Sequence, residues 1–183
     1  MEYGSIAQYL PELISALLEL ATTGISLVKE SALTAIASIA DIAKENYIPY
    51  FQKTTEIIFN IIQNHPGKEY KELKGLTIEA LGSIAEGIGK EAFQPAAAPF
   101  IEYLITVQSS KFEQVDPQKQ YVLAGWQRIS TVFGKDLAPF LPRILPDLFN
   151  IVEGLVEASI KTSNLDNLID PEDDKGEIKI NTY

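Results

Sequence analysis

The motif Ile88-Gly89-Lys90-Glu91 recurs in related form as Ile42-Ala43-Lys44-Glu45 and as Phe133-Gly134-Lys135-Asp136. The three lysines are 46 and 45 residues apart. Each motif ends a segment with helical apolar spacing, and a proline soon opens the next segment, at positions 49, 95 and 139. Helix pairs that repeat every ~40–47 residues are typical of HEAT and armadillo arrays. Because each unit here holds two long helices, the sequence favours HEAT repeats.

An apolar stripe repeats together with the motif. Positions two, nine and twelve residues before each lysine are apolar, and such positions share one face of a helix. We therefore predict that nine residues form the core between the helices. They are Ala32, Ala35, Ile42, Ile78, Leu81, Ile88, Leu123, Trp126 and Phe133.

Helical spacing of apolar residues extends over most of the chain and predicts an all-α protein. The expected helices span 5–23, 27–45, 48–64, 69–88, 94–109, 117–133 and 138–160. In each pair the first helix (A) opens at a proline and the second (B) ends at the lysine motif. The fold class predicted is a right-handed α-solenoid of HEAT repeats, with about three and a half helix pairs over residues 1–160.

The seventh helix has no B partner, so the chain looks like a fragment of a longer solenoid. We expect its apolar residues Leu145, Leu148, Phe149 and Val152 to form an exposed patch that drives self-association. Residues 161–183 are acidic and rich in turn-forming residues, and we expect a mobile loop or tail there.

Composition restricts the function. The chain of 183 residues has 25 acidic and 15 basic residues, a formal net charge of −10. Such a field repels phosphate backbones and anionic membranes, so we expect no nucleic acid and no membrane as partner, and a basic partner instead. No apolar run reaches the ~20 residues of a membrane span, and the N-terminal residues do not resemble a signal peptide, which predicts an intracellular protein.

Catalytic machinery is not visible in the sequence. There is no Cys and a single His, His65, in a loop sequence, which argues against metal centres and His-based catalysis. The Gly-Lys pairs lack the other residues of a phosphate-binding Walker loop and fit helix C-termini instead. We therefore predict no catalytic, metal-binding or cofactor-binding residues, and a protein that is not an enzyme.

Acidic residues on the B helices are the candidate binding residues. Glu72, Glu79 and Glu86 are seven residues apart, and Glu30 and Asp41 are eleven apart, so each set shares one helical face. Both sets lie off the apolar stripe and would attract lysine-rich peptides. An ordinary solvated face of an acidic protein is the alternative interpretation.

Two residues near the third lysine motif, Trp126 and Arg128, are relevant to this candidate binding face. Core packing is the default expectation for Trp126, and partial exposure beside Arg128 would instead offer a platform for a lysine stem. Arg128 points to the same side as the acidic residues and places a positive charge among them.

Residues along nearly the whole chain resemble a known family. The segments are 30–41, Tyr47-Ile48-Pro49-Tyr50, 75–79, 89–93 and Asp116-Pro117-Gln118, followed by Tyr121, Trp126, Arg128 and Gly134-Lys135. In this order they resemble the middle of karyopherin-beta (importin-beta-type) nuclear import receptors, above all the karyopherin beta three branch. The acidic residues 166–174 stand where that branch carries an acidic insertion.

The resemblance implies a receptor that binds basic cargo proteins or nuclear localisation signals on its concave B-helix face. The cargo-binding candidates are Glu30, Asp41, Glu72, Glu79, Glu86 and Trp126. For the full-length receptor it also implies release by the GTPase Ran, contact with Phe-Gly repeats of nucleoporins, and shuttling between cytoplasm and nucleus. A HEAT-repeat scaffold or adaptor in a multiprotein assembly, with no transport role, is the alternative.

Overall fold

A computed structural model describes residues 6–110, 112 and 116–166, with side chains described as far as 154. The helices are α1 (Leu10–Thr23), α2 (Ser26–Ala43), α3 (Ile48–Asn64), α4 (Lys71–Gln108), α5 (Gln118–Phe133) and α6 (Leu141–Asp166). Short 3-10 turns connect them: η2 (Lys44–Tyr47), η3 (Lys68–Tyr70) and η4 (Gly134–Phe140). None of these helices is long and apolar enough to cross a membrane.

Helix α4 consists of two helices that meet at Gly89, where φ is 80° and ψ is 172°. This backbone conformation is accessible to glycine and strained for other residues, so the chain changes direction there without a loop. Counting the two parts of α4 separately gives the seven helical segments that the sequence predicts. The largest differences are at the ends, where α1 begins at Leu10 and α6 extends to Asp166.

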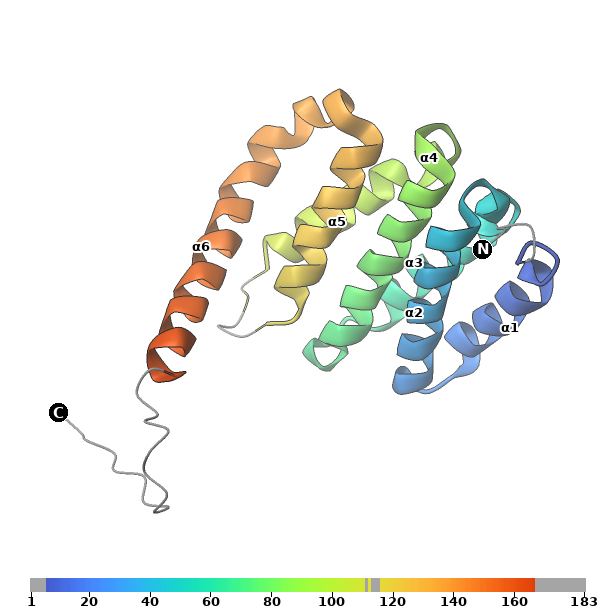
Figure 1. Cartoon of the computed structure of the whole chain (residues 1–183), viewed down its shortest axis with the longest axis horizontal. Coiled ribbons are helices and arrows are strands. Elements are labelled where there is room, and N and C mark those ends of the chain that lie inside the picture. The colour runs from blue at the N-terminus through green and yellow to red at the C-terminus, as the bar shows by residue number, and fades with distance from the viewer. Residues whose placement is uncertain (1–5, 111, 113–115, 167–183) are drawn as a thin grey trace, which may run out of the picture.

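The helices stack as a solenoid. Helices α2, α4 and α5 follow one another side by side, with α1 at one end of the stack and α6 at the other (Figure 1). The first part of α4 packs between α2 and α5, which are the B helices of the neighbouring pairs. The predicted all-α solenoid of helix pairs is confirmed. Of the tail predicted for residues 161–183, residues 161–166 belong to helix α6 instead, and the rest lies outside the described residues.

The register of the first repeat differs from the prediction by one residue. Positive φ angles occur at Lys44 (49°), Gly89 (80°) and Gly134 (49°), which are 45 residues apart in both intervals. Lys44 is therefore structurally equivalent to Gly89 and Gly134, although the sequence motifs align it with Lys90.

That shift explains why the prediction for Ile42 is wrong. Ile42 is 46% exposed, whereas Ala43, the residue before the positive φ, is buried. One residue turns a side chain by about 100° around a helix, so the core stripe of α2 includes Leu33 and Ile36 instead. Ala35 is only partly buried.

The other predicted core residues lie inside the protein. Leu123 is partly buried. Those that are buried are Ala32, Ile78, Leu81, Ile88, Trp126 and Phe133.

Helix α6 presents an apolar face to solvent at the end of the stack. Leu145, Phe149 and Val152 are exposed, and Leu148 is partly buried. The exposure of this patch is as predicted. Self-association through it remains a prediction.

Candidate functional site: the acidic face of α2, α4 and α5

Two side chains of α5 lie across α4 at glycines. A Cβ atom at Gly75 would lie 2.1 Å from Cδ2 of Tyr121, and one at Gly82 would lie 2.8 Å from Cδ of Arg128. The two glycines are seven residues apart on α4, and Tyr121 and Arg128 are seven residues apart on α5. The same side of each helix therefore makes the contact again two turns later. The two glycines make room for Tyr121 and Arg128 to reach the acidic residues of α4 and α2.

Tyr121 is hydrogen-bonded to one carboxylate and lies in the field of two more. Its hydroxyl donates a hydrogen bond of 2.6 Å to Oε1 of Glu72. Desolvation by burial raises the pKa of Tyr121 well above its ordinary value, and the hydrogen bond to Glu72 and the charges of Glu72, Glu79 and Glu30 raise it further. The charges of Glu30, Glu72 and Glu79 therefore act on one phenol, and we call these three residues the acidic cluster.

A hollow opens beside this cluster. Its volume is ≈ 400 Å³, and Glu72, Glu79, Tyr121 and Arg128 are among its lining residues. Glu30 has a hydrogen bond of its own, since its Oε1 accepts one of 3.1 Å from the hydroxyl of Ser26.

Arg128 forms ion pairs with the other two candidate carboxylates. Its Nη1 atom lies 3.1 Å from Oδ1 of Asp41 on α2 and 2.8 Å from Oε2 of Glu86 on α4. One guanidinium thus connects three consecutive B helices. We call this group of Asp41, Glu86 and Arg128 the arginine clamp.

The structure thus divides the five predicted carboxylates between the acidic cluster and the arginine clamp. Glu72, Glu86 and Asp41 are exposed, and Glu30 and Glu79 are partly buried. This division depends on Tyr121 and on the two glycines, none of which the sequence analysis named as a site residue. Their signal was present, because Gly75 and Gly82 repeat the seven-residue spacing of the glutamates.

Trp126 lies away from this face. It is 5% exposed, and its indole N–H donates a hydrogen bond of 2.7 Å to Oε1 of Gln108 in the second part of α4. Two residues correspond to about 200° around a helix, so Trp126 and Arg128 point to opposite sides of α5. Core packing of Trp126 is confirmed, and no indole platform is open beside Arg128.

The chemistry available on this face is ionic recognition. Partly exposed ion pairs are worth only ~0.2–1 kcal/mol each, so binding requires several carboxylates at once. A cation within a few ångströms of the acidic cluster would interact with three negative charges. Among the residues that the structure describes, no three His, Cys, Asp or Glu side chains are grouped to hold a metal ion.

Comparison with protein families gives a match over most of the chain. The family described as "Importin subunit beta-1-like, TPR repeats" matches residues 3–167. Importin subunit beta-3 of Saccharomyces cerevisiae is 33% identical over 140 residues, which are 76% of this chain and 13% of that protein. The probable importin subunit beta-4 of Schizosaccharomyces pombe is 30% identical over 158 residues, which are 84% of this chain and 14% of that protein.

Solved structures agree with this result. The crystal structure of Kap121p bound to Pho4p aligns with a TM-score of 0.71 and 31% identity, covering 80% of this chain and 13% of that one. The structure of Kap121p bound to Nup53p aligns with the same score, identity and coverage. The chain thus spans 13–14% of the length of these relatives.

Proposed function

The chain belongs to the importin-beta, or karyopherin-beta, family, and from this premise we propose that it is part of the cargo-binding surface of a nuclear transport receptor. Its ligand is a basic, extended import signal held on the face of α2, α4 and α5. A receptor of this kind shuttles between cytoplasm and nucleus. Contacts with Ran and with Phe-Gly repeats belong to the proposal for the full-length receptor.

The observation that carries the proposal is the acidic cluster around Tyr121. Three carboxylates from two neighbouring B helices act on one phenol beside a hollow of ≈ 400 Å³. A lysine ammonium in this hollow would face Glu72 and Glu79, which line it, and the charge of Glu30 acts on the Tyr121 phenol at its edge. Support also comes from the net charge of −10, and from Kap121p, which has been solved bound to Pho4p and bound to Ste12p.

The arginine clamp refines the proposal. Asp41 and Glu86 already share a guanidinium, so a basic ligand competes with Arg128 for them. Glu30, Glu72 and Glu79 are therefore the principal cargo residues in our proposal, and Asp41 and Glu86 are secondary. Trp126 has no part in it because it is buried.

Binding of a fluorescent lysine-rich import-signal peptide tests the proposal by titration. We expect Glu79→Lys to weaken binding several-fold, and Glu30→Lys/Glu79→Lys to weaken it more than tenfold, because each change replaces attraction by repulsion. Glu56→Lys on α3 is the matched control, since Glu56 is exposed and lies on an A helix. The site assignment is wrong if Glu56→Lys weakens binding as much as Glu79→Lys.

A scaffold or adaptor subunit is the second candidate function. The observation that favours it is the exposed apolar face of α6, with Leu145, Phe149 and Val152 at the end of the stack. A scaffold would show no saturable, sequence-dependent binding of basic peptides. The same titration therefore separates the two functions.

A further inference from the structure

A second hollow lies where the beginning of α4, the second part of α4 and the beginning of α5 meet. Its volume is ≈ 430 Å³, and it is lined by Lys68, Lys71 and Lys74, by Asp116, and by apolar residues that include Ile62 and Val107. Three of the 15 basic residues of a chain with net charge −10 thus border one hollow. We call it the lysine hollow.

Two of these lysines are held in place by the fold. Nζ of Lys71 lies 2.7 Å from Oδ2 of Asp116, whose side chain is 1% exposed. Nζ of Lys74 donates hydrogen bonds of 2.8 and 3.0 Å to the carbonyl oxygens of Pro66 and Gly67. Desolvation lowers the pKa of Lys74, against the opposing charge of Glu69. The ammonium groups are therefore fixed before any ligand arrives, while Lys68 is exposed.

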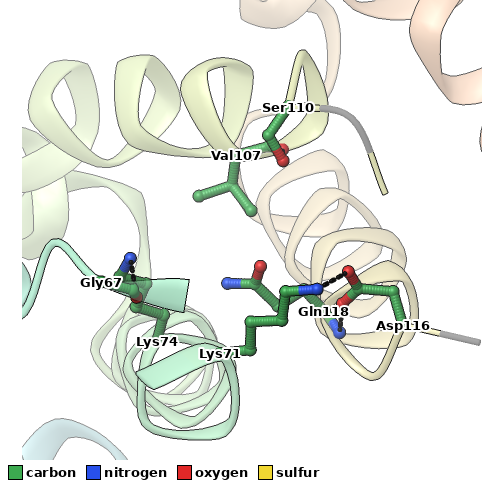
Figure 2. Close-up of polar contacts among 7 residues, drawn as sticks. All are labelled: Gly67, Lys71, Lys74, Val107, Ser110, Asp116 and Gln118. Carbon is green, nitrogen blue, oxygen red and sulfur yellow. Dashed lines mark hydrogen bonds and ion pairs between the residues drawn. The ribbon is translucent and has the colours of Figure 1, made fainter. Parts of the chain in front are cut away.

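Gln118 gives an independent indication that this hollow accepts a ligand. The residue is 6% exposed, and its side-chain amide makes no hydrogen bond to any residue in the described part of the chain. Figure 2 shows this amide pointing into the space between Lys71 and Val107. The amide borders the hollow, so a ligand that carries both a donor and an acceptor could pair with it.

We propose that the lysine hollow binds a short acidic peptide segment of a partner protein. An Asp or Glu side chain of the peptide interacts with Lys68 and with the remaining N–H of Lys74. A peptide group of the ligand pairs with the amide of Gln118, and an apolar side chain next to the acidic residue packs against Ile62 and Val107. The choice of an acidic peptide rests on charge complementarity to the lysines and on the apolar walls.

This proposal is independent of the proposed function, because the two sites select ligands of opposite charge. The acidic cluster includes Glu72 and the lysine hollow includes Lys71, so adjacent residues of α4 serve different hollows. Failure of one site would leave the other intact.

Fluorescence anisotropy of the full chain with the labelled peptide Glu-Asp-Phe-Glu-Asp, near physiological ionic strength, tests the proposal. We expect saturable binding, at least fivefold weaker binding to Lys68→Glu, and at least fivefold weaker binding to Gln118→Leu. Lys135→Glu is the matched control, since Lys135 is exposed and lies in η4, outside the lysine hollow. Its binding should change by less than twofold.

Two further measurements make the result specific. Replacement of Phe by Ser in the peptide should weaken binding at least fivefold, because the apolar contact is lost. Thermal unfolding followed by circular dichroism should show that Lys68→Glu remains folded. The proposal is overturned if no saturable binding occurs, if Lys135→Glu weakens binding as much as Lys68→Glu, or if the Phe replacement has no effect.

Discussion

The side chain of Arg128 crosses helix α4 directly over Gly82, where a Cβ atom would lie 2.8 Å from the arginine Cδ. This crossing lets a residue of α5 reach Asp41 on α2, 87 positions earlier in the sequence. The arginine is paired with two of the five candidate carboxylates. In the proposed function it would compete with a basic ligand for these two.

Arg128→Gln should therefore strengthen the binding of a lysine-rich peptide. Removing the guanidinium frees Asp41 and Glu86, and we expect a gain of about three- to tenfold from two partly exposed ion pairs. Arg143→Gln is the matched control, because Arg143 of α6 makes an exposed ion pair with Glu102 in the second part of α4, away from the acidic face. Peptide titration measures the affinity of both variants. If the two gain affinity equally, the gain comes from net charge alone and the prediction for Arg128 is wrong.

Gly75→Ala should destabilise the protein by about 1–3 kcal/mol, as overpacking does. The new Cβ would lie 2.1 Å from the Tyr121 ring, so the ring must move and lose its hydrogen bond to Glu72. Urea unfolding measures the change. In a Tyr121→Ala background the same substitution should cost much less, and an unchanged cost would contradict the predicted clash.

Lys44→Gly should stabilise the protein by about 0.5–2 kcal/mol. Among the described residues, Lys44 is the non-glycine residue with a positive φ, 49°. Such strain costs about 1–3 kcal/mol, against about 0.5–1 kcal/mol for the greater freedom of glycine in the unfolded chain. Lys135→Gly, at a position without positive φ, should destabilise in the same denaturation experiment.

Stability should decrease at high pH because of Tyr47. Desolvation raises the pKa of its buried hydroxyl to about 12, and the hydrogen bond to Thr54 partly opposes that shift. The unfolded state loses this proton near pH 10, so the contribution of Tyr47 is fully present below about pH 10 and is lost as pH rises through about 12. It amounts to at most about 2–3 kcal/mol.

Tyr47→Phe should therefore flatten the decline of unfolding free energy between pH 10 and 12. Tyr103, whose pKa burial also raises to about 12, keeps part of the slope. Tyr9→Phe, at an exposed position, is the control and should leave the slope unchanged. Equal slopes in all three proteins would refute the assignment to Tyr47.

Phe149→Asp should reduce self-association of the chain. Phe149 is 62% exposed and is flanked by exposed Leu145 and Val152, so a charge there interrupts the apolar face. Sedimentation velocity at increasing concentration measures the effect, with Asn150→Asp as the control for charge alone. A parent chain that stays monomeric at high concentration would contradict the prediction.

The sequence by itself determined the helix pairs, their repeat at intervals of 46 and 45 residues and the shared face of the B-helix carboxylates. These features follow from periodicity within single helices: Glu72, Glu79 and Glu86 fall on one face of any α-helix. Family membership was also evident from ordered motifs along the chain. The sequence was sufficient because each of these features depends on the order and spacing of residues along the chain, without contacts between distant helices.

Only the tertiary structure decided which of these carboxylates are neutralised and where a second hollow forms. Arg128 meets Asp41 across 87 residues, and Lys71 meets Asp116 across 45. Such contacts depend on the rotation and spacing of packed helices, which a one-residue change in register alters by about 100°. For the same reason, comparison of the motifs in the sequence aligned Lys44 with Lys90. In the structure Lys44 has a positive φ and is therefore equivalent to Gly89 and Gly134. This difference of one residue leaves Ile42 exposed.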